Sequence, residues 1–184
     1  GTVSIKNKAA ASVTITGTDS AISYTGTAID VSQYFTIDTN AGTPTYSLIT
    51  DAEEPTGEGT LNGSNLSVTR IGTFKVKVKT AANGIYATGE ESITLTVNKK
   101  DVTITAQAQS IQWGNPISQS AYDVSENGIA AGDRIAEITL TPSTTELTEE
   151  GTISISGVKI ENTAGRDVTG NYDIALENGT LTIA

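Results

Sequence analysis

The sequence predicts an all-β protein built from two small β-sandwich domains in tandem, and three observations support this prediction. The first is an internal repeat, the second is a period-two alternation of apolar and polar residues, and the third is a set of Asn-Gly turns. The chain has 184 residues, which suits two sandwich domains of roughly 100 residues each. No stretch keeps a helical period over several turns.

The repeat relates the two halves of the chain at an offset of 89 residues. Val-Thr-Ile-Thr at residues 13–16 recurs at residues 102–105, and Tyr24 is matched by Trp113 at the same offset. Two further matches keep the same order along the chain, residues 72–76 with 151–155 and residues 94–97 with 180–183. A repeat of this kind predicts two copies of one architecture.

A short basic step precedes each Val-Thr-Ile-Thr segment and marks a predicted boundary. It reads Ile-Lys-Asn-Lys at residues 5–8 and Val-Asn-Lys-Lys at residues 97–100. The predicted domains are therefore residues 1–98 and residues 99–184.

The first residues also echo the last strand of the second half. Gly-Thr-Val-Ser-Ile at residues 1–5 resembles Gly-Thr-Leu-Thr-Ile at residues 179–183. Residues 1–8 are therefore interpreted as a linker or as the last strand of a preceding domain, and the chain as a piece of a longer array.

The alternation is clearest between Thr73 and Lys79, where Phe74, Val76 and Val78 are predicted to face a core and the intervening lysines to face solvent. The same pattern, rich in Thr, Val and Ile, predicts strands elsewhere. These lie at residues 13–16, 45–48, 65–69, 92–97, 102–105, 135–140, 152–155 and 172–175. Asn-Gly pairs that predict hairpins or loop reversals begin at Asn62, Asn83, Asn127 and Asn178.

Composition excludes several functions. The net charge is -10, with six basic and nine acidic residues up to Asn98 and five basic and twelve acidic residues after it. A nucleic-acid partner is therefore not expected, because binding to phosphates needs a surplus of Lys and Arg. Acidity spread over both halves is typical of solubility. The apolar runs are too short for membrane insertion.

The chain contains no Cys, Met or His. Thiol nucleophiles, disulfides, zinc sites built on thiolate or imidazole, and a Ser nucleophile activated by His are thereby excluded. The absence of Cys is compatible with an oxidising location outside the cell. No enzyme activity and no cofactor are predicted, and the chain is expected to be a monomer.

The second half resembles the MBG domain, a mostly bacterial immunoglobulin-like module found in tandem in large secreted and surface proteins. The residues on which this resemblance rests are 102–105, the turn Trp-Gly-Asn-Pro at 113–116, Gly128, Ile129, Gly132, Asp133, Asn171, Tyr172 and residues 178–183. Trp113 stands where that family usually has Tyr. The first half is similar to a related bacterial immunoglobulin-like repeat through residues 24–26, Tyr46, 72–74 and 83–86. The resemblance implies two immunoglobulin-like sandwiches at a bacterial cell surface or in a secreted protein, with neighbouring modules of the same chain as partners.

Two sets of residues are candidates for ligand binding. Trp113 is the only Trp, and an exposed aromatic ring can stack on a sugar. Because Trp113 matches Tyr24, a shared packing role is the favoured interpretation. Lys75, Lys77 and Lys79 form a basic row that would suit an anionic glycan. The favoured interpretation of this row is the solvent-exposed face of a strand. The lysines would discourage pairing at a sheet edge, and Glu90 or Glu91 would be their cross-strand partners.

Other sites are weighed and set aside. The carboxylate pairs beginning at Glu53, Glu90 and Glu149 could serve glycoside hydrolysis, but adjacent residues on a strand point to opposite faces. For calcium, the nearest sequences are residues 38–42 and 162–173, and both are interpreted as loops without a metal site. An internal Lys-Asn isopeptide bond is disfavoured, since most lysines lie at junctions or on a wet strand face.

The leading functional hypothesis is a non-catalytic structural and adhesive spacer in a bacterial surface or secreted protein. The alternative is a carbohydrate-binding module attached to a glycan-active protein. A glycan or a surface protein is the expected external partner.

Overall fold

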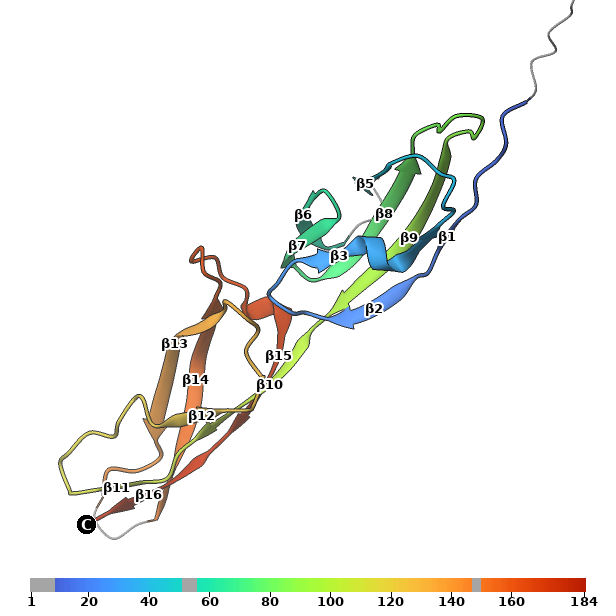
Figure 1. Cartoon of the computed structure of the whole chain (residues 1–184). Helices are drawn as coiled ribbons and strands as arrows, with labels where there is room; N and C mark the ends of the chain where they lie inside the picture. The colour runs from blue at the N-terminus through green and yellow to red at the C-terminus, as the bar shows by residue number, and fades with distance from the viewer. Residues whose placement is uncertain (1–8, 51–55, 147–149) are drawn as a thin grey trace, which may run out of the picture. The chain divides into compact units, whose positions relative to one another are not determined.

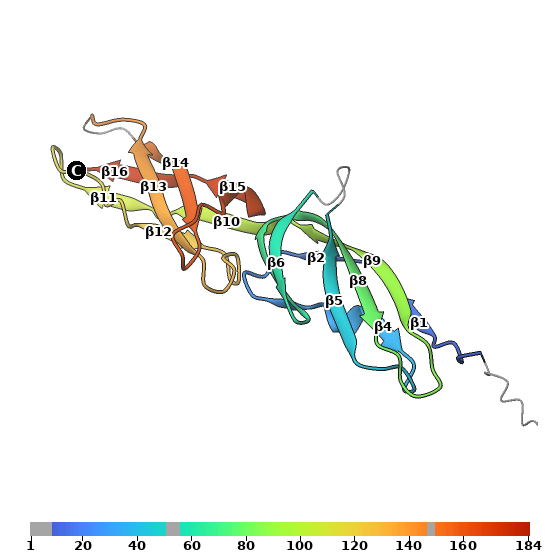
Figure 2. The ribbon, with the colours of Figure 1, turned by 90° about the horizontal axis from the view of Figure 1, so that it is seen from above.

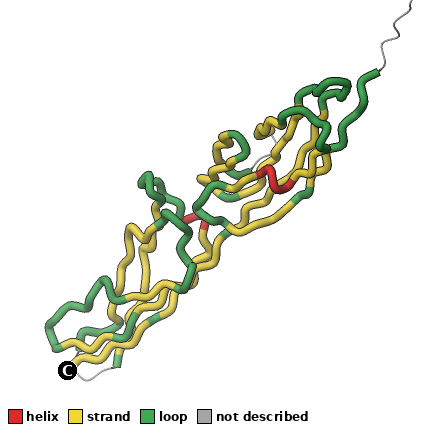
Figure 3. The backbone as a smooth tube through the Cα atoms, in the orientation of Figure 1, coloured by secondary structure: helices red, strands yellow, loops and turns green. Residues whose placement is uncertain are grey.

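The computed structural model describes residues 9–50, 56–146 and 150–184, which form strands and two single-turn 3-10 helices (Figures 1 and 3). The chain divides into two compact units. Unit 1 comprises Gly1–Ile22, Ala28–Ser67 and Gly72–Val97, and unit 2 comprises Ser23–Thr27, Val68–Ile71 and Asn98–Ala184. Two short segments from the first half of the sequence thus belong to unit 2. The interpretation of residues 1–8 as a linker or strand concerns residues outside the described ranges.

A four-stranded sheet forms the larger layer of unit 1. Its order is β2 (Ser20–Ser23), β9 (Gly89–Asn98), β8 (Gly72–Thr80) and β5 (Pro44–Ile49). The long strand β8 runs antiparallel to both β9 and β5, and Figure 2 shows these three strands side by side. Such a sheet buries one face and leaves the other to solvent.

Two smaller groups of strands form the second layer of unit 1. One is the pair β1 (Ile15–Gly17) and β4 (Phe35–Ile37), and the other has the order β3 (Ile29–Asp30), β7 (Asn65–Arg70) and β6 (Glu58–Asn62). The helical turn η1 (Val31–Tyr34) joins β3 to β4. A Cβ atom added at Gly59 would lie 3.2 Å from the Phe74 ring, and one at Gly17 would meet Ile93. The second layer therefore packs directly on β8 and β9.

Unit 2 is also a two-layer sandwich. Its four-stranded sheet has the order β11 (Gln109–Ile111), β16 (Gly179–Ile183), β14 (Gly151–Glu161) and β13 (Arg134–Pro142). The other sheet has the order β12 (Tyr122–Val124), β10 (Lys100–Ala106) and β15 (Tyr172–Glu177). The helical turn η2 (Thr169–Asn171) leads into β15.

The predicted duplication is confirmed for most strands. Counted from its first strand, β2-β9-β8-β5 of unit 1 has the same order as β11-β16-β14-β13 of unit 2. The antiparallel pair β1–β4 also recurs as β10–β12, because Ile15 pairs with Ile37 and Ile104, 89 residues after Ile15, pairs with Val124, 87 residues after Ile37. The protein is all-β, with two immunoglobulin-like sandwich domains.

The second layers of the two units differ. In unit 1 the chain between β5 and β8 forms the β6–β7 hairpin, which pairs with β3. In unit 2 only residues 143–150 separate β13 from β14, which is too short for a hairpin of that size. The halves are therefore duplicates in the four-stranded sheet but not in every strand.

The first two strands of the continuous segment of unit 2, β10 and β11, run parallel to its last two strands, β15 and β16. β10 pairs with β15 from Lys100 with Tyr172 onward, and β11 pairs with β16 up to Ile111 with Ile183. Both pairings keep an offset of 72 residues. The two strands thus cross together from one sheet to the other, as Figure 1 shows.

Asn178-Gly179 lies at this crossing, and the prediction of a reversal there is wrong. The chain continues from β15 into β16 in the same direction along its partner strand. A Cβ atom at Gly179 would lie 2.6 Å from the carbonyl oxygens of both Ala106 and Gln107. Close approach of two backbones explains this glycine, whereas Gly63 after Asn62 has the positive φ of 60° expected in a hairpin turn.

The predicted alternation on β8 is confirmed. Phe74, Val76 and Val78 are at most 1% exposed, and the lysines between them lie on the opposite face. In unit 2 the same pattern buries Val102, Ile104 and Ala106 along β10.

Replacing Phe74 with Ala is expected to lower the free energy of unfolding of unit 1 by about 3–5 kcal/mol, because the ring fills the space against Gly57 and Gly59. Urea unfolding followed by circular dichroism measures this loss. Lys79→Ala, on the exposed face of the same strand, is the matched control and should change stability by no more than about 0.5 kcal/mol. Equal effects of the two substitutions would contradict the assignment of faces.

Candidate functional site

The three lysines of the predicted basic row lie together on the outer face of the unit 1 sheet. Lys77 is opposite Ser47 of β5 and Ser92 of β9, so short polar side chains flank the middle lysine of the row. The Nζ atom of Lys77 lies 3.6 Å from Oε2 of Glu90, which confirms one of the two predicted cross-strand partners. An exposed pair of this kind contributes less than about 1 kcal/mol.

The structure corrects the proposed reason for these lysines. β8 is an inner strand, paired on both sides by β9 and β5. Lys75, Lys77 and Lys79 therefore do not protect a sheet edge. Their role in the fold is to keep the solvent side of a central strand polar.

Trp113 belongs to unit 2 and so lies in a different unit from the lysine row. It lies two residues beyond the end of β11, and its backbone N–H donates to the carbonyl oxygen of Ala184 at 3.0 Å. Its side chain is 63% exposed, whereas Tyr24 is 4% exposed. The interpretation that the two aromatic residues share a packing role is therefore wrong for this chain, because the same sequence position has opposite burial in the two halves.

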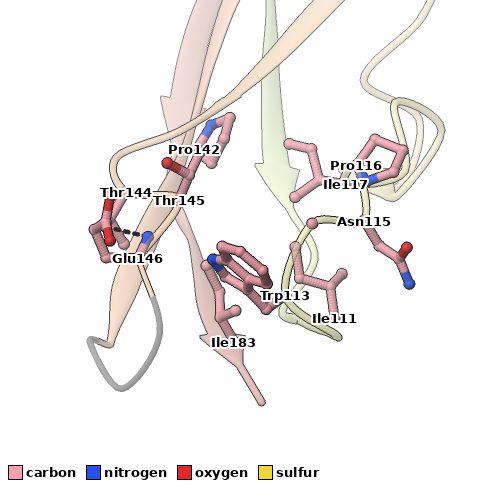
Figure 4. Close-up of a pocket in the computed structure, with 11 residues that line it drawn as sticks. Ile111, Trp113, Asn115, Pro116, Ile117, Pro142, Thr144, Thr145, Glu146 and Ile183 are labelled. Atoms are coloured by element: carbon pink, nitrogen blue, oxygen red, sulfur yellow. Dashed lines mark hydrogen bonds between the residues drawn. The ribbon is translucent and has the colours of Figure 1, made fainter.

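A cavity of about 460 Å³ opens beside Trp113, and Figure 4 shows the side chains around it. Most of its wall is apolar, and the members of that wall are Ile111, Trp113, Pro116, Ile117, Pro142 and Ile183. Asn115, Thr144, Thr145 and Glu146 supply polar atoms. The Thr144 hydroxyl accepts a hydrogen bond from the Glu146 backbone at 3.1 Å. An exposed aromatic ring with few polar groups around a hollow is a common form of small-ligand site.

Sequence reasoning missed a cluster in unit 2 made of three buried residues, Tyr24, Asn171 and Tyr172, and the half-buried Asp133; we call it the tyrosine cluster. The rings of Tyr24 and Tyr172 meet edge to face, with centroids 5.7 Å apart. The Tyr172 hydroxyl donates to Oδ2 of Asp133 at 2.6 Å and accepts from the backbone N–H of Ala130 at 3.1 Å. The Asn-Tyr pair and Asp133 were noticed only as carriers of the family resemblance, since pairwise sequence patterns do not show which polar groups meet in space.

Asn171 is 2% exposed, yet its amide makes two hydrogen bonds inside unit 2. Oδ1 accepts from the backbone N–H of Ile71 at 3.1 Å, and Nδ2 donates to the carbonyl oxygen of Thr69 at 3.3 Å. A buried amide is tolerated only when it is satisfied in this way. The segment Val68–Ile71 is thus tied to η2 by a side chain acting on backbone groups.

Burial raises the pKa of the Tyr24 hydroxyl from 10.0 to about 12, and the nearby charge of Asp133 acts in the same direction. The pKa of Tyr172 is also raised, first by burial and then by its hydrogen bond to Asp133. Both tyrosines are therefore neutral at physiological pH. In the structure they act as hydrogen-bonding and packing groups.

The remaining acidic candidates make local contacts. Glu91 Oε1 accepts from the Ser92 backbone N–H at 2.8 Å. In the two calcium candidates, Oδ1 of Asp38 accepts from the Asn40 backbone at 2.9 Å, and Oδ1 of Asn162 accepts from the Ala164 and Arg166 backbones at 3.0 Å. Within residues 9–50, 56–146 and 150–184 no three acidic residues are grouped so as to hold a metal ion. Glu53, Glu54 and Glu149 lie outside the described residues.

Lys159 is the lysine with the most ionic partners among the described residues. Its Nζ lies 3.3 Å from Glu137 Oε1 and 3.0 Å from Glu161 Oε1, and hydrogen bonds to these carboxylates raise its pKa.

No described helix has the length and apolar character needed to cross a membrane.

Alkaline pH is expected to destabilise unit 2 through the tyrosine cluster. Because the pKa of Tyr24 is higher in the folded state, the folded chain holds this proton more tightly than the unfolded chain. The stabilisation is complete below pH 10.0 and is lost as pH rises toward about 12. Urea unfolding at a series of pH values measures the slope, and Tyr24→Phe should make it shallower. Tyr34→Phe, in η1 of unit 1, is the control, and an equal change of slope there would contradict the assignment.

No protein-family model matches the chain, and no curated protein matches it. Among solved structures, the chain is similar to the EC1-2 fragment of human protocadherin-24, with 7% sequence identity, 94% of this chain and 97% of that chain covered, and a TM-score of 0.28. It is also similar to Drosophila N-cadherin EC1-4, with 13% identity, 90% and 48% coverage, and a TM-score of 0.27. The chain thus spans about half the length of the N-cadherin chain. Both TM-scores are low, so the fold assignment rests on the strand pairing of the chain itself.

Proposed function

We propose that this chain supplies non-catalytic structural and adhesive spacer modules to a bacterial surface or secreted protein. The C-terminal half is proposed to be an MBG-type module and the N-terminal half a related bacterial immunoglobulin-like repeat, with neighbouring modules as its partners. The motifs of the second half and the repeated sheet order support this assignment. The single observation that carries the function is the parallel pairing of the first and last strands of unit 2.

This pairing determines how the module responds to tension. When a module is pulled at its first and last strands, parallel neighbours slide past one another in opposite directions. The evenly spaced hydrogen bonds of β10 with β15 and of β11 with β16 then share the load and must break together. If the same strands were peeled apart from one end, the bonds would break one at a time. A module with parallel terminal strands therefore resists extension, which is what a load-bearing spacer requires.

Force applied along the terminal strands should unfold unit 2 only at a much higher load than force applied across them. The chain has no Cys, so attachment points can be placed freely by substitution. Lys99→Cys with Thr182→Cys loads the paired strands in shear, and Lys99→Cys with Asp173→Cys peels them from one end. All three positions are exposed. Single-molecule force spectroscopy is expected to give a several-fold higher unfolding force in the first geometry, because forced unfolding is governed by the barrier to breaking these bonds.

The two attachment pairs share one handle, so they serve as matched controls for each other. Urea unfolding of both double variants should give the same free energy, which separates mechanical from thermodynamic stability. Equal unfolding forces in the two directions would refute the load-bearing role.

The alternative function, carbohydrate binding, is favoured by one specific observation, the exposed Trp113 ring beside an apolar cavity. A sugar with an apolar face would stack on the ring, and Asn115, Thr144 and Glu146 would offer hydrogen bonds at its edge. Lys75, Lys77 and Lys79 remain a separate candidate surface for an anionic glycan.

A glycan array tests the alternative. If Trp113 binds sugar, Trp113→Ala should abolish binding while circular dichroism shows an unchanged fold, since the exposed side chain contributes little to the core. Ile85→Ala, at another exposed apolar residue, is the control and should leave binding unchanged. Binding that survives Trp113→Ala but is lost in Lys75→Ala would place the ligand on the lysine row instead. If the chain binds none of the bacterial wall and host glycans on the array, the spacer remains the proposed function.

A further inference from the structure

Trp113 and Tyr24 occupy the same backbone position in the repeat. They are separated by the repeat offset of 89 residues. Tyr24 directly follows β2, and Trp113 lies two residues beyond β11; β2 and β11 are each the edge strand of a four-stranded sheet. The Tyr24 N–H donates to the carbonyl oxygen of Asn98 at 2.9 Å, and the Trp113 N–H donates to that of Ala184 at 3.0 Å. The hydrogen bond is thus repeated at the end of the last strand in both halves.

The surroundings of the two rings differ. Within unit 2, the Tyr24 ring is covered by the ring of Tyr172, the residue that begins β15. The Tyr24 hydroxyl also interacts with the Asn171 side chain. Trp113 has no such cover and stands 63% exposed beside its cavity. One member of the repeated pair therefore has its covering residues in the structure, and the other presents an open apolar surface.

The residue that corresponds to Tyr172 in unit 1 is Tyr86. Lys100 pairs in parallel with Tyr172, and Ala11, which is 89 residues before Lys100, forms a parallel bridge with Tyr86. Backbone hydrogen bonds join Ala11 N–H to the Ile85 carbonyl and Ala87 N–H to the Ala11 carbonyl, both at 2.8 Å. Unit 1 thus has the covering position of the repeat, with Ile85 where unit 2 has Asn171.

This position in unit 1 is itself open and apolar. Ile85 is 67% exposed. A cavity of about 290 Å³ adjoins it, lined by Ala9, Ala10, Ala11, Gly84 and Ile85. We call these residues the Ile85 surface. All five side chains or glycine positions of this surface are apolar and uncharged, so the surface suits an aromatic ring.

We infer that the Trp113 cavity of one copy of this chain docks on the Ile85 surface of a second copy, in the way that Tyr24 is covered by the Asn171-Tyr172 pair inside unit 2. This inference rests on the proposed spacer function and names the partner of the Trp113 surface. Because the two surfaces are different, the contact is head to tail and extends into an array instead of closing into a dimer. A contact of this small size forms when the copies are linked, since a short linker holds the partner at a millimolar effective concentration.

The test is a tandem of two chains in which Trp113 of the first copy is the sole Trp. The second copy starts at Lys6, so that residues 179–183 of the first copy stand where the similar residues 1–5 stood, and it carries Trp113→Phe. Acrylamide quenching and the emission maximum of Trp113 are compared with those of the single chain. Docking should lower the quenching constant roughly two-fold or more and shift the emission to the blue, because the ring leaves water.

The same substitution placed in either copy gives a matched control. Ile85→Asp in the second copy should restore the quenching of the single chain, whereas the same substitution in the first copy should have no effect. Quenching that is equal in the tandem and the single chain would overturn the inference, as would protection that persists with Ile85→Asp in the second copy.

The remaining outcomes also decide the question. Protection of Trp113 in the single chain by N-acetylglucosamine oligosaccharides, with no protection in the tandem, would overturn docking in favour of a sugar site. A tandem that leaves Trp113 exposed while unit 2 still resists shear would refute docking alone and leave the spacer function intact.

Discussion

The parallel pairing of the first and last strands is the constraint on which unit 2 depends. The offset of 72 residues is kept from Lys100 to Ile111, although the strand pair changes sheet between β10 and β11. Keeping the register through that change requires the two backbones to approach closely, and Gly179 makes this possible because a side chain there would collide with two carbonyl groups. The same pairing connects the termini of the module across its hydrogen bonds and positions Trp113 through Ala184.

A second constraint is the satisfaction of polar groups inside unit 2. Asn171 is buried and bonds to the backbones of Thr69 and Ile71, and the Tyr172 hydroxyl bonds to both Asp133 and Ala130. Leaving any of these groups without a partner in the interior would cost about 1–3 kcal/mol. The apolar strands supply the driving force for folding. These directed hydrogen bonds specify that the backbones of Thr69, Ile71 and Ala130 lie against η2 and the start of β15. Tyr24 completes the cluster by packing on Tyr172.

Sequence patterns predicted the strands well because their cause is local. Alternation along β8 follows from the pleat, so Phe74 and Lys75 had to face opposite ways. The position of β8 in the middle of its sheet depends on which strands pair over long distances, and no local pattern carries that information. The extra hairpin in unit 1 and the crossing at Asn178-Gly179 were unforeseen for the same reason. The tyrosine cluster joins residues far apart in sequence, so the repeat singled out only Tyr24, and Asp133, Asn171 and Tyr172 were visible only through a family resemblance.

Trp113 shows what a repeat can and cannot predict. An offset of 89 residues correctly places the backbone of Trp113 where that of Tyr24 lies, including the hydrogen bond at the end of the last strand. Burial, however, is set by neighbouring segments, which differ between the two positions. An aromatic residue that recurs at the same position of the internal repeat but is open to water has a large apolar area that a partner can bury. The physical reason that made a shared packing role attractive therefore still applies to Trp113, provided that the covering residues come from outside the 184 residues of this chain.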